Sequence, residues 1–303
     1  MNTYMDITVY YLNSFTYNGS GGNPAGVVLN ADNLTPQQMQ YIATQVGYSE
    51  TAFVSADVEC DFNVRFFTPN HEVDFCGHAT LATFSLLFEK QIIEAQEYTQ
   101  QTKAGKLKVK VATDTLVNME QTLPQYLGVV ESKEVAELLN ISETLFATTN
   151  LPCEIISTGL ADVIIPVPFG TLDSIVPDLD KISRFSEKYN AIGIHLFELS
   201  PAQKNISESN SNSLTASCRN FAPLFGIPEE SATGSACGAL ACYLDKYKVI
   251  DGQHYTFEQG RIMESPSLLK ASIFKRDSII TKVEVSGFAY LFDCKKIKYP
   301  RIC

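Results

Sequence analysis

The sequence predicts an α+β protein of two pseudo-symmetric domains, each a β-barrel-like sheet wrapped around a central helix, with the active site in the cleft between them. Three observations predict this class. The chain has two apolar runs of helix length. An approximate internal repeat precedes each run, and short segments in which apolar and polar residues alternate surround both runs. At 303 residues the chain is long enough for two domains, each with its own core.

The first apolar run, from Ala79 to Phe88, has apolar side chains on every side of a 3.6-residue period. A helix that is apolar all round is a buried helix. Its amino end, at Gly77, leaves backbone N–H groups and a positive dipole end inside the protein, where an anionic ligand can satisfy both. The sequence therefore predicts half of an active site at this helix start.

A second copy of this region predicts the other half. Its second apolar run extends from Cys237 to Leu244. The second copy matches the first only approximately, because the segment between its proline and its glycine is three residues longer than in the first copy. The matching stretches are Arg65-Phe66-Phe67-Thr68-Pro69 with Arg219-Asn220-Phe221-Ala222-Pro223, and Cys76-Gly77-His78-Ala79 with Thr233-Gly234-Ser235-Ala236.

The elements of the first half are strands around two helices. Thr35 is the expected N-cap of a helix that begins at Pro36 and ends before Gly47. The Gly/Asn/Ser-rich stretch 13–26 is expected to be a loop that lines the cleft or joins two strands. Strands are predicted at 6–12, 48–54, 58–67, 106–111 and 115–120.

The second half begins after the weak pattern at 122–135, so the predicted domains are 1–125 and 126–286, with strands at about 287–303 returning to the first domain. A helix is predicted near 131–140 with Ser132 as its cap, and residues 201–217 are expected to form an exposed loop. Strands are predicted at 153–157, 161–167, 191–199, 255–259, 261–263, 268–274, 279–285 and 287–292.

The composition excludes several classes of protein. With 45% hydrophobic and 19% charged residues the chain is typical of a globular domain. A net charge of -11 disfavours nucleic acid and anionic membranes as partners. The amino terminus has no signal-peptide pattern and no apolar run could span a bilayer, so we expect a cytoplasmic protein. The eight cysteines lack metal-ligand spacing, so most are expected to be reduced core thiols, and no metal is expected.

Four motifs together resemble the PhzF-like phenazine-biosynthesis family, within the diaminopimelate-epimerase-like fold. The resemblance implies two domains that are each a barrel around a helix, no cofactor, and a homodimer. The motifs are Gly22-Asn23-Pro24-Ala25-Gly26-Val27, Ser49-Glu50-Thr51-Ala52-Phe53-Val54, the stretch from Arg65 through Thr80, and Phe221-Ala222-Pro223 followed by Ala232-Thr233-Gly234-Ser235-Ala236.

The family's isomerases move a proton within a ring that carries a carboxylate, as in trans-2,3-dihydro-3-hydroxyanthranilate, and the resemblance assigns that proton transfer to Glu50. It implies that His78 assists, and that Gly77, Gly234, Ser235 and Glu230 hold the substrate, with Cys76 in the cleft wall. One position departs from the family, because Glu229-Glu230-Ser231 replaces the usual Glu-Asp-Pro. The extra methylene can displace a carboxylate by more than ~1 Å, enough to change the substrate.

Two alternatives remain open at this point. The first is an amino-acid racemase or epimerase that uses two thiols, with Cys76 as the first. The position equivalent to Cys76 in the second copy holds Thr233, whose hydroxyl is far less acidic than a thiol. The second is a non-catalytic protein that binds a small molecule, which the change at Glu230 suggests and the set of Glu50, His78 and Ser235 disfavours.

Overall fold

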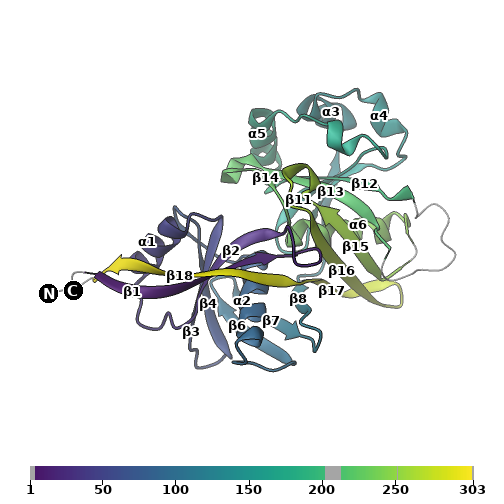
Figure 1. Cartoon of the computed structure of the whole chain (residues 1–303). Coiled ribbons are helices and arrows are strands. Elements are labelled where there is room, and N and C mark those ends of the chain that lie inside the picture. The colour runs from purple at the N-terminus through teal and green to yellow at the C-terminus, as the bar shows by residue number, and fades with distance from the viewer. Residues whose placement is uncertain (1–3, 202–212, 251, 302–303) are drawn as a thin grey trace. The chain divides into compact units, whose positions relative to one another are not determined.

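The computed structural model describes residues 4–201, 213–250 and 252–301. The chain divides into two compact units, Met1–Glu120 with Ser286–Cys303, and Gln121–Val285. Each unit contains helices and a sheet, which confirms the α+β class (Figure 1). Among the described helices, none has the length and apolar character needed to cross a membrane.

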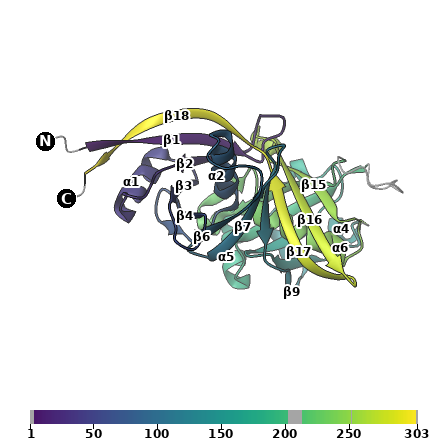
Figure 2. The same cartoon turned by 90° about the horizontal axis from the view of Figure 1, so that it is seen from below.

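The sheet of the first unit runs in the order β18, β1, β2, β3, β4, β6, β7, β8. The β2–β3 and β4–β6 pairs are parallel and the others antiparallel, and β5 forms a short hairpin with β4. Figure 2 shows β1 and β18 side by side along their length. The strands are β1 (Tyr4–Ser14), β2 (Asn23–Val28), β3 (Glu50–Ser55), β4 (Phe62–Phe67), β5 (Glu72–Val73), β6 (Glu97–Thr102), β7 (Gly105–Val111), β8 (Val117–Gln121) and β18 (Ala289–Pro300).

Helix α2 (Gly77–Glu89) is the central helix of the first unit. It contacts β1, β2, β3, β7 and β18, and its residues 78–84 are all buried. Burial on every side explains its continuous apolar sequence. The chain also passes close to β1 just before β18 begins, because a Cβ on Gly287 would lie 2.5 Å from the ring of Phe15.

Helix α1 (Pro36–Val46) confirms the predicted caps. Thr35 accepts a hydrogen bond from the backbone N–H of Gln38, whose side chain in turn accepts from the N–H of Thr35. This reciprocal pair is a capping box. Gly47 ends the helix at φ +73°, a left-handed conformation that glycine adopts without steric cost.

The sheet of the second unit repeats the order of the first. Its order is β9, β10, β11, β12, β13, β15, β16, with β11–β12 and β13–β15 parallel and β14 in a hairpin with β13. The strands are β9 (Gln125–Val130), β10 (Cys153–Ser157), β11 (Ala161–Pro166), β12 (Gly193–Leu199), β13 (Ala216–Ala222), β14 (Ile227–Glu230), β15 (His254–Gln259), β16 (Ser267–Arg276) and β17 (Ile279–Gly287).

The helices of the second unit follow the same repeat. α6 (Gly234–Lys246) stands in the chain between β14 and β15, as α2 stands between β5 and β6, and α5 (Leu179–Tyr189) stands between β11 and β12, as α1 stands between β2 and β3. α6 contacts β10, β11 and β16, whereas α3 (Ser132–Leu139), α4 (Thr144–Ala147) and α5 gather at one end of the unit in Figure 1. The shared order of strands and helices confirms the pseudo-symmetry predicted from the repeat.

Several predicted elements were wrong in detail. Residues Arg261–Met263 form a 3₁₀ turn, because Gly260 turns the chain at φ +85°. Ser132 is the first residue of α3 rather than its cap, and its hydroxyl donates to Glu143. Residues 23–26 belong to β2, and β4 begins at Phe62 rather than at 58. Of the expected loop 201–217, residues 202–212 lie outside the described part, and 216–217 belong to β13.

Candidate active site

Glu50 and His78 meet in the first unit. Glu50 is the first residue of β3 and His78 the second residue of α2, and α2 packs against β3. The Nε2 atom of His78 lies 3.2 Å from Oε2 of Glu50, and the two side chains are only 6% and 13% exposed. Within the described residues, this Oε2 atom is buried and no group satisfies it with hydrogen-bond geometry. The pair is therefore close and shielded from water, and one buried carboxylate oxygen lacks a hydrogen bond.

Three polar side chains that the sequence did not single out surround His78. The amide Nδ2 of Asn23 lies 3.4 Å from Nδ1, and the hydroxyl of Ser49 lies 3.4 Å from Nε2. The hydroxyl of Ser14 donates to the His78 backbone carbonyl at 2.6 Å. Gly22, at φ +91° and packed against the Ser14 carbonyl, leaves no room for a Cβ in the turn before Asn23. Asn23 and Ser49 belong to two of the motifs that carry the family resemblance. Membership of those motifs is the only feature of the sequence that could have identified them as site residues.

Cys76 is the N-cap of α2. Its Sγ accepts a hydrogen bond from the N–H of Ala79 and lies 3.4 Å from Nδ1 of His78. Gly77 follows it, and a Cβ built there meets nothing within 4 Å. The first turn of α2 therefore presents backbone N–H groups beside open space, an arrangement that favours an anion.

Glu230 and Thr233 lie at the corresponding helix start in the second unit. Thr233 is the N-cap residue of α6, and its hydroxyl donates to the carboxylate of Glu230. Gln259, which sequence reasoning missed, accepts from the N–H of Thr233 at 3.2 Å and donates to the backbone carbonyl of Glu230 at 2.7 Å. Gln259 is 1% exposed, so these hydrogen bonds are shielded from water.

Gly234 and Ser235 are the first two residues of α6. The hydroxyl of Thr158 donates to the backbone carbonyl of Ser235 at 3.2 Å. Thr233 makes no side-chain cap to this helix, in contrast to Cys76 at α2. The N–H groups of the first turn of α6 therefore have no cap from Thr233, and they can bind an anion in the same way as those of α2.

Each helix start is preceded by the same arginine arrangement. Arg65 makes two hydrogen bonds to Glu72, at 2.7 and 2.9 Å, and Arg219 makes two to Glu229, at 2.8 and 2.9 Å. Each guanidinium also lies over an aromatic ring two residues further along the strand, Phe67 or Phe221. The two arginines of the sequence repeat thus fasten the short β5 and β14 strands in the same way.

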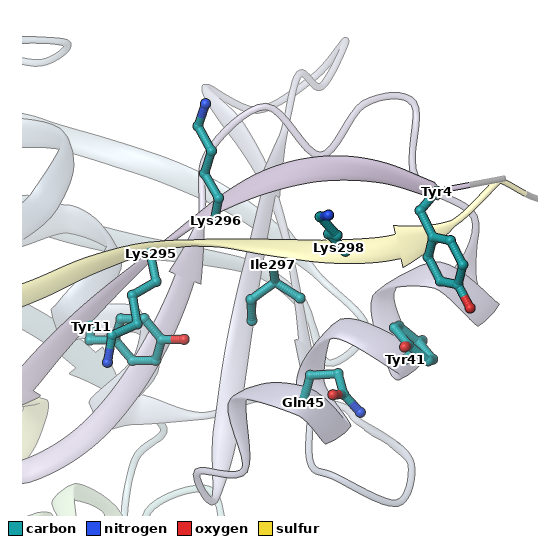
Figure 3. A pocket seen from close by; sticks show the side chains of 8 residues that line it. All are labelled: Tyr4, Tyr11, Tyr41, Gln45, Lys295, Lys296, Ile297 and Lys298. Atoms are coloured by element: carbon teal, nitrogen blue, oxygen red, sulfur yellow. The ribbon is translucent and has the colours of Figure 1, made fainter. Parts of the chain in front are cut away.

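A surface hollow of about 450 Å³ lies elsewhere on the first unit, beside β18 and α1 (Figure 3). It offers no carboxylate, thiol or imidazole, and none of the residues predicted for the active site lines it. Lys295, at one end of it, is paired with Asp293 at 2.6 Å. The hollow is lined by Tyr4, Tyr11, Tyr41, Gln45, Lys295, Lys296, Ile297 and Lys298.

Nearly the whole chain is similar to proteins of one known family. The profile of the family described as "PhzC-PhzF: Phenazine biosynthesis-like protein" matches residues 12–293. The chain is 32% identical to the "Uncharacterized isomerase YddE" of Escherichia coli (strain K12), over 93% of this chain and 95% of that one. It is 31% identical to the "Trans-2,3-dihydro-3-hydroxyanthranilate isomerase" of Pseudomonas chlororaphis, over 89% and 92%.

A similar structure has also been solved. The crystal structure of the Bacillus anthracis phenazine biosynthesis protein of the PhzF family superposes with a TM-score of 0.84 at 28% identity. The superposition covers 97% of this chain and 99% of that one. The likeness therefore extends over both units of the chain.

Proposed function

Because the chain belongs to the phenazine biosynthesis-like PhzC-PhzF family, we propose that it is a cofactor-independent isomerase that moves a proton within a small carboxylate-bearing substrate. The observation that carries the proposal is the 3.2 Å approach of His78 Nε2 to Glu50 Oε2 at the start of a buried helix. The relatives named isomerases support the reaction class.

Glu50 is the general acid and base in this proposal. Its carboxylate takes a proton from one carbon of the substrate, and the electron pair left behind spreads into the adjacent unsaturated system. The protonated Glu50 then returns the proton to another carbon, so that atoms and electrons balance without a co-reactant. His78, whose Nε2 lies 3.2 Å from the carboxylate, assists the transfer.

Substrate binding falls to the helix starts. We assign carboxylate binding to backbone N–H groups at Gly77 in the first unit and to those at Gly234, with the hydroxyl of Ser235, in the second, because helix amino ends favour anions. Cys76 lines the site in the first unit, and Glu230 contacts the substrate in the second. Glu230 is held by Thr233 and Gln259, and its length relative to the family's usual aspartate sets which substrate is accepted.

Racemisation through two thiols is the second candidate. The observation in its favour is the 3.4 Å separation between Cys76 Sγ and His78 Nδ1, which suits a proton-exchanging thiol. Against it, Thr233 occupies the N-cap of α6 as Cys76 occupies that of α2, and its hydroxyl is engaged by Glu230. A two-thiol racemase would lose turnover in Cys76→Ser and invert chiral amino acids, which polarimetry detects.

The test is deuterium incorporation from heavy water into a panel of cyclic carboxylates and amino acids, read by mass spectrometry. The proposal expects exchange in at least one compound, abolished in Glu50→Gln. If no compound of the panel exchanges but some bind, a non-catalytic binding protein becomes the better account.

Two finer expectations complete the proposal. We infer a cytoplasmic protein that acts as a homodimer, on the basis of the sequence and the family resemblance. Sedimentation equilibrium of the purified chain should give twice the 33.5 kDa of one copy. The mass of a monomer at micromolar protein concentration would contradict the predicted homodimer.

A further inference from the structure

The side chains at the start of α2 also have the chemistry of a metal site. Glu50, Cys76 and His78 each offer one ligand atom, and these atoms all lie within 4.8 Å of one another. The Nε2 atom of His78 is 3.2 Å from the Glu50 carboxylate and 3.8 Å from the Cys76 sulfur. One sulfur, one nitrogen and one oxygen therefore converge on a small volume.

These separations suit a tetrahedral cation. Zinc bonds of about 2.0 Å to nitrogen, 2.1 Å to oxygen and 2.3 Å to sulfur place ligand atoms about 3.3 to 3.6 Å apart at tetrahedral angles. Two of the separations differ from those values by a few tenths of an ångström, and the third, between the carboxylate and the sulfur, is within 4.8 Å, so side-chain rotation has to bring those two atoms together by up to about 1.2 Å. Three protein ligands leave the fourth position for water or substrate.

Two further observations favour a ligand at this point. The buried Oε2 of Glu50 has no hydrogen-bond partner among the described residues, so a cation would satisfy it. The side-chain amide of Asn23 lies 3.4 Å from Nδ1 of His78, and with its oxygen turned toward that nitrogen it would accept from the Nδ1–H of an imidazole that binds the cation through Nε2.

We propose that Glu50, Cys76 and His78 form an inhibitory binding site for a soft divalent cation of the zinc class. A carboxylate, a thiolate and a neutral imidazole carry two negative charges, which match such a cation, and binding releases the thiol proton to solvent. The cation occupies the two side chains that the proposed reaction needs free. The inhibition thus rests on the proposed function, whereas the binding itself does not.

Four of the other buried thiols are poor competitors for the cation. Burial raises the pKa of Cys153 and of Cys242 to about 12, and holds those of Cys218 and Cys237 well above the ordinary range, so all four stay protonated. Cys76 differs from them in position, because its sulfur lies at a helix amino end and 3.4 Å from an imidazole nitrogen. Cys294 is exposed and provides the matched control.

The test is titration of the full chain with Co²⁺ in the absence of any substrate, followed by displacement with Zn²⁺. We expect one equivalent of Co²⁺ to give a near-ultraviolet thiolate-to-metal absorption band that Zn²⁺ abolishes. Cys76→Ser should lose the band and Cys294→Ser should keep it. Glu50→Gln should keep the band but weaken binding by at least about tenfold.

Three results would overturn the site: no band in the wild type, an equal band in folded Cys76→Ser, or loss of the band in Cys294→Ser. If Cys76→Ser does not fold, as judged by circular dichroism, unchanged Co²⁺ affinity in Glu50→Gln refutes the site instead. Because no substrate is present, a negative outcome leaves the proposed isomerase intact, and failure of the deuterium exchange leaves the cation site intact.

Discussion

Nε2 of His78 lies 3.2 Å from Oε2 of Glu50, although 28 positions separate the two residues in the sequence. Each is at the start of its element, Glu50 at the first residue of β3 and His78 in the first turn of α2. The packing of α2 on β3 therefore fixes their separation before any ligand arrives. Such preorganisation is what a proton-transfer pair requires, because little reorganisation remains for the reaction.

Replacement of His78 by Gln should lower kcat more than it raises KM. Gln lacks the ring nitrogen that assists Glu50, and general acid–base assistance is worth roughly 10²- to 10⁴-fold. Steady-state kinetics measures the changes in kcat and KM separately, with the substrate that exchanges its proton in the deuterium experiment. The matched control is His71→Gln, since His71 is exposed and its Nδ1 lies 3.4 Å from the hydroxyl of Thr68. A loss confined to KM would show that His78 only binds substrate.

Gly77→Ala should raise KM by about tenfold or more without loss of stability, since a 1 Å misplacement of substrate is costly. A Cβ at this position meets nothing within 4 Å, so the protein has room for the methyl group. Alanine also favours a helix over glycine. The methyl group would instead occupy the space beside the α2 amino end. Thermal unfolding and KM are measured on the same variant. An unchanged KM in the folded variant would show that the substrate does not bind at the start of α2.

Gln259→Leu should weaken both stability and substrate binding. It removes the partners of the Thr233 N–H and the Glu230 carbonyl, and each buried polar group left unpaired costs about 1–3 kcal/mol. Chemical denaturation measures the loss of stability. Gln259→Glu keeps the acceptor for Thr233 and should recover part of it. Equal KM values in wild type and folded Gln259→Leu would show that Gln259 does not position Glu230 for substrate.

Asp162 should make stability fall as pH rises. Burial raises its pKa from 3.8 to about 7, so between about pH 4 and pH 7 the folded protein keeps a proton that the unfolded chain has lost. His195 acts in the opposite direction, because burial lowers its pKa from 6.5 to about 3 and stability rises between those values. The side chain of Asn220, whose amide lies 3.3 Å from Nδ1 of His195, lowers the pKa of Asp162 and partly offsets the rise.

Asp162→Asn removes the contribution to the free energy of unfolding that falls as pH rises, and leaves the contribution of His195, which rises with pH. The variant should match the wild type near pH 4 and become more stable toward pH 7, by at most about 4 kcal/mol. Denaturation at several pH values checks this, with the exposed Asp6→Asn as control. Parallel stability curves for wild type and Asp162→Asn would contradict the assignment.

The sequence predicted best what depends on local pattern. The central helices α2 and α6 follow from apolar residues on all sides, and the caps of α1 follow from Thr35, Pro36 and Gly47. The arginine repeat at Arg65 and Arg219 predicted the matching topologies of the units, because each arginine fastens an equivalent hairpin.

What the sequence missed depends on contacts between distant residues. Asn23, Ser49 and Gln259 are polar residues whose partners stand 55, 29 and 26 positions away, and periodicity carries no information on such pairs. Helix α5 was also missed, although Asp178 caps it by accepting from the N–H of Lys181. Its position between β11 and β12 repeats that of α1, so extending the repeat would have predicted it.

The most direct test of the account compares Glu50→Gln with Glu89→Gln, the same change at an exposed carboxylate near the end of α2. The measurement is the rate of deuterium incorporation from heavy water into the substrate that the wild type exchanges. The account predicts a loss of roughly 10²-fold or more in Glu50→Gln, with substrate still bound, and a wild-type rate in Glu89→Gln. Exchange at the wild-type rate in folded Glu50→Gln would show that another group moves the proton.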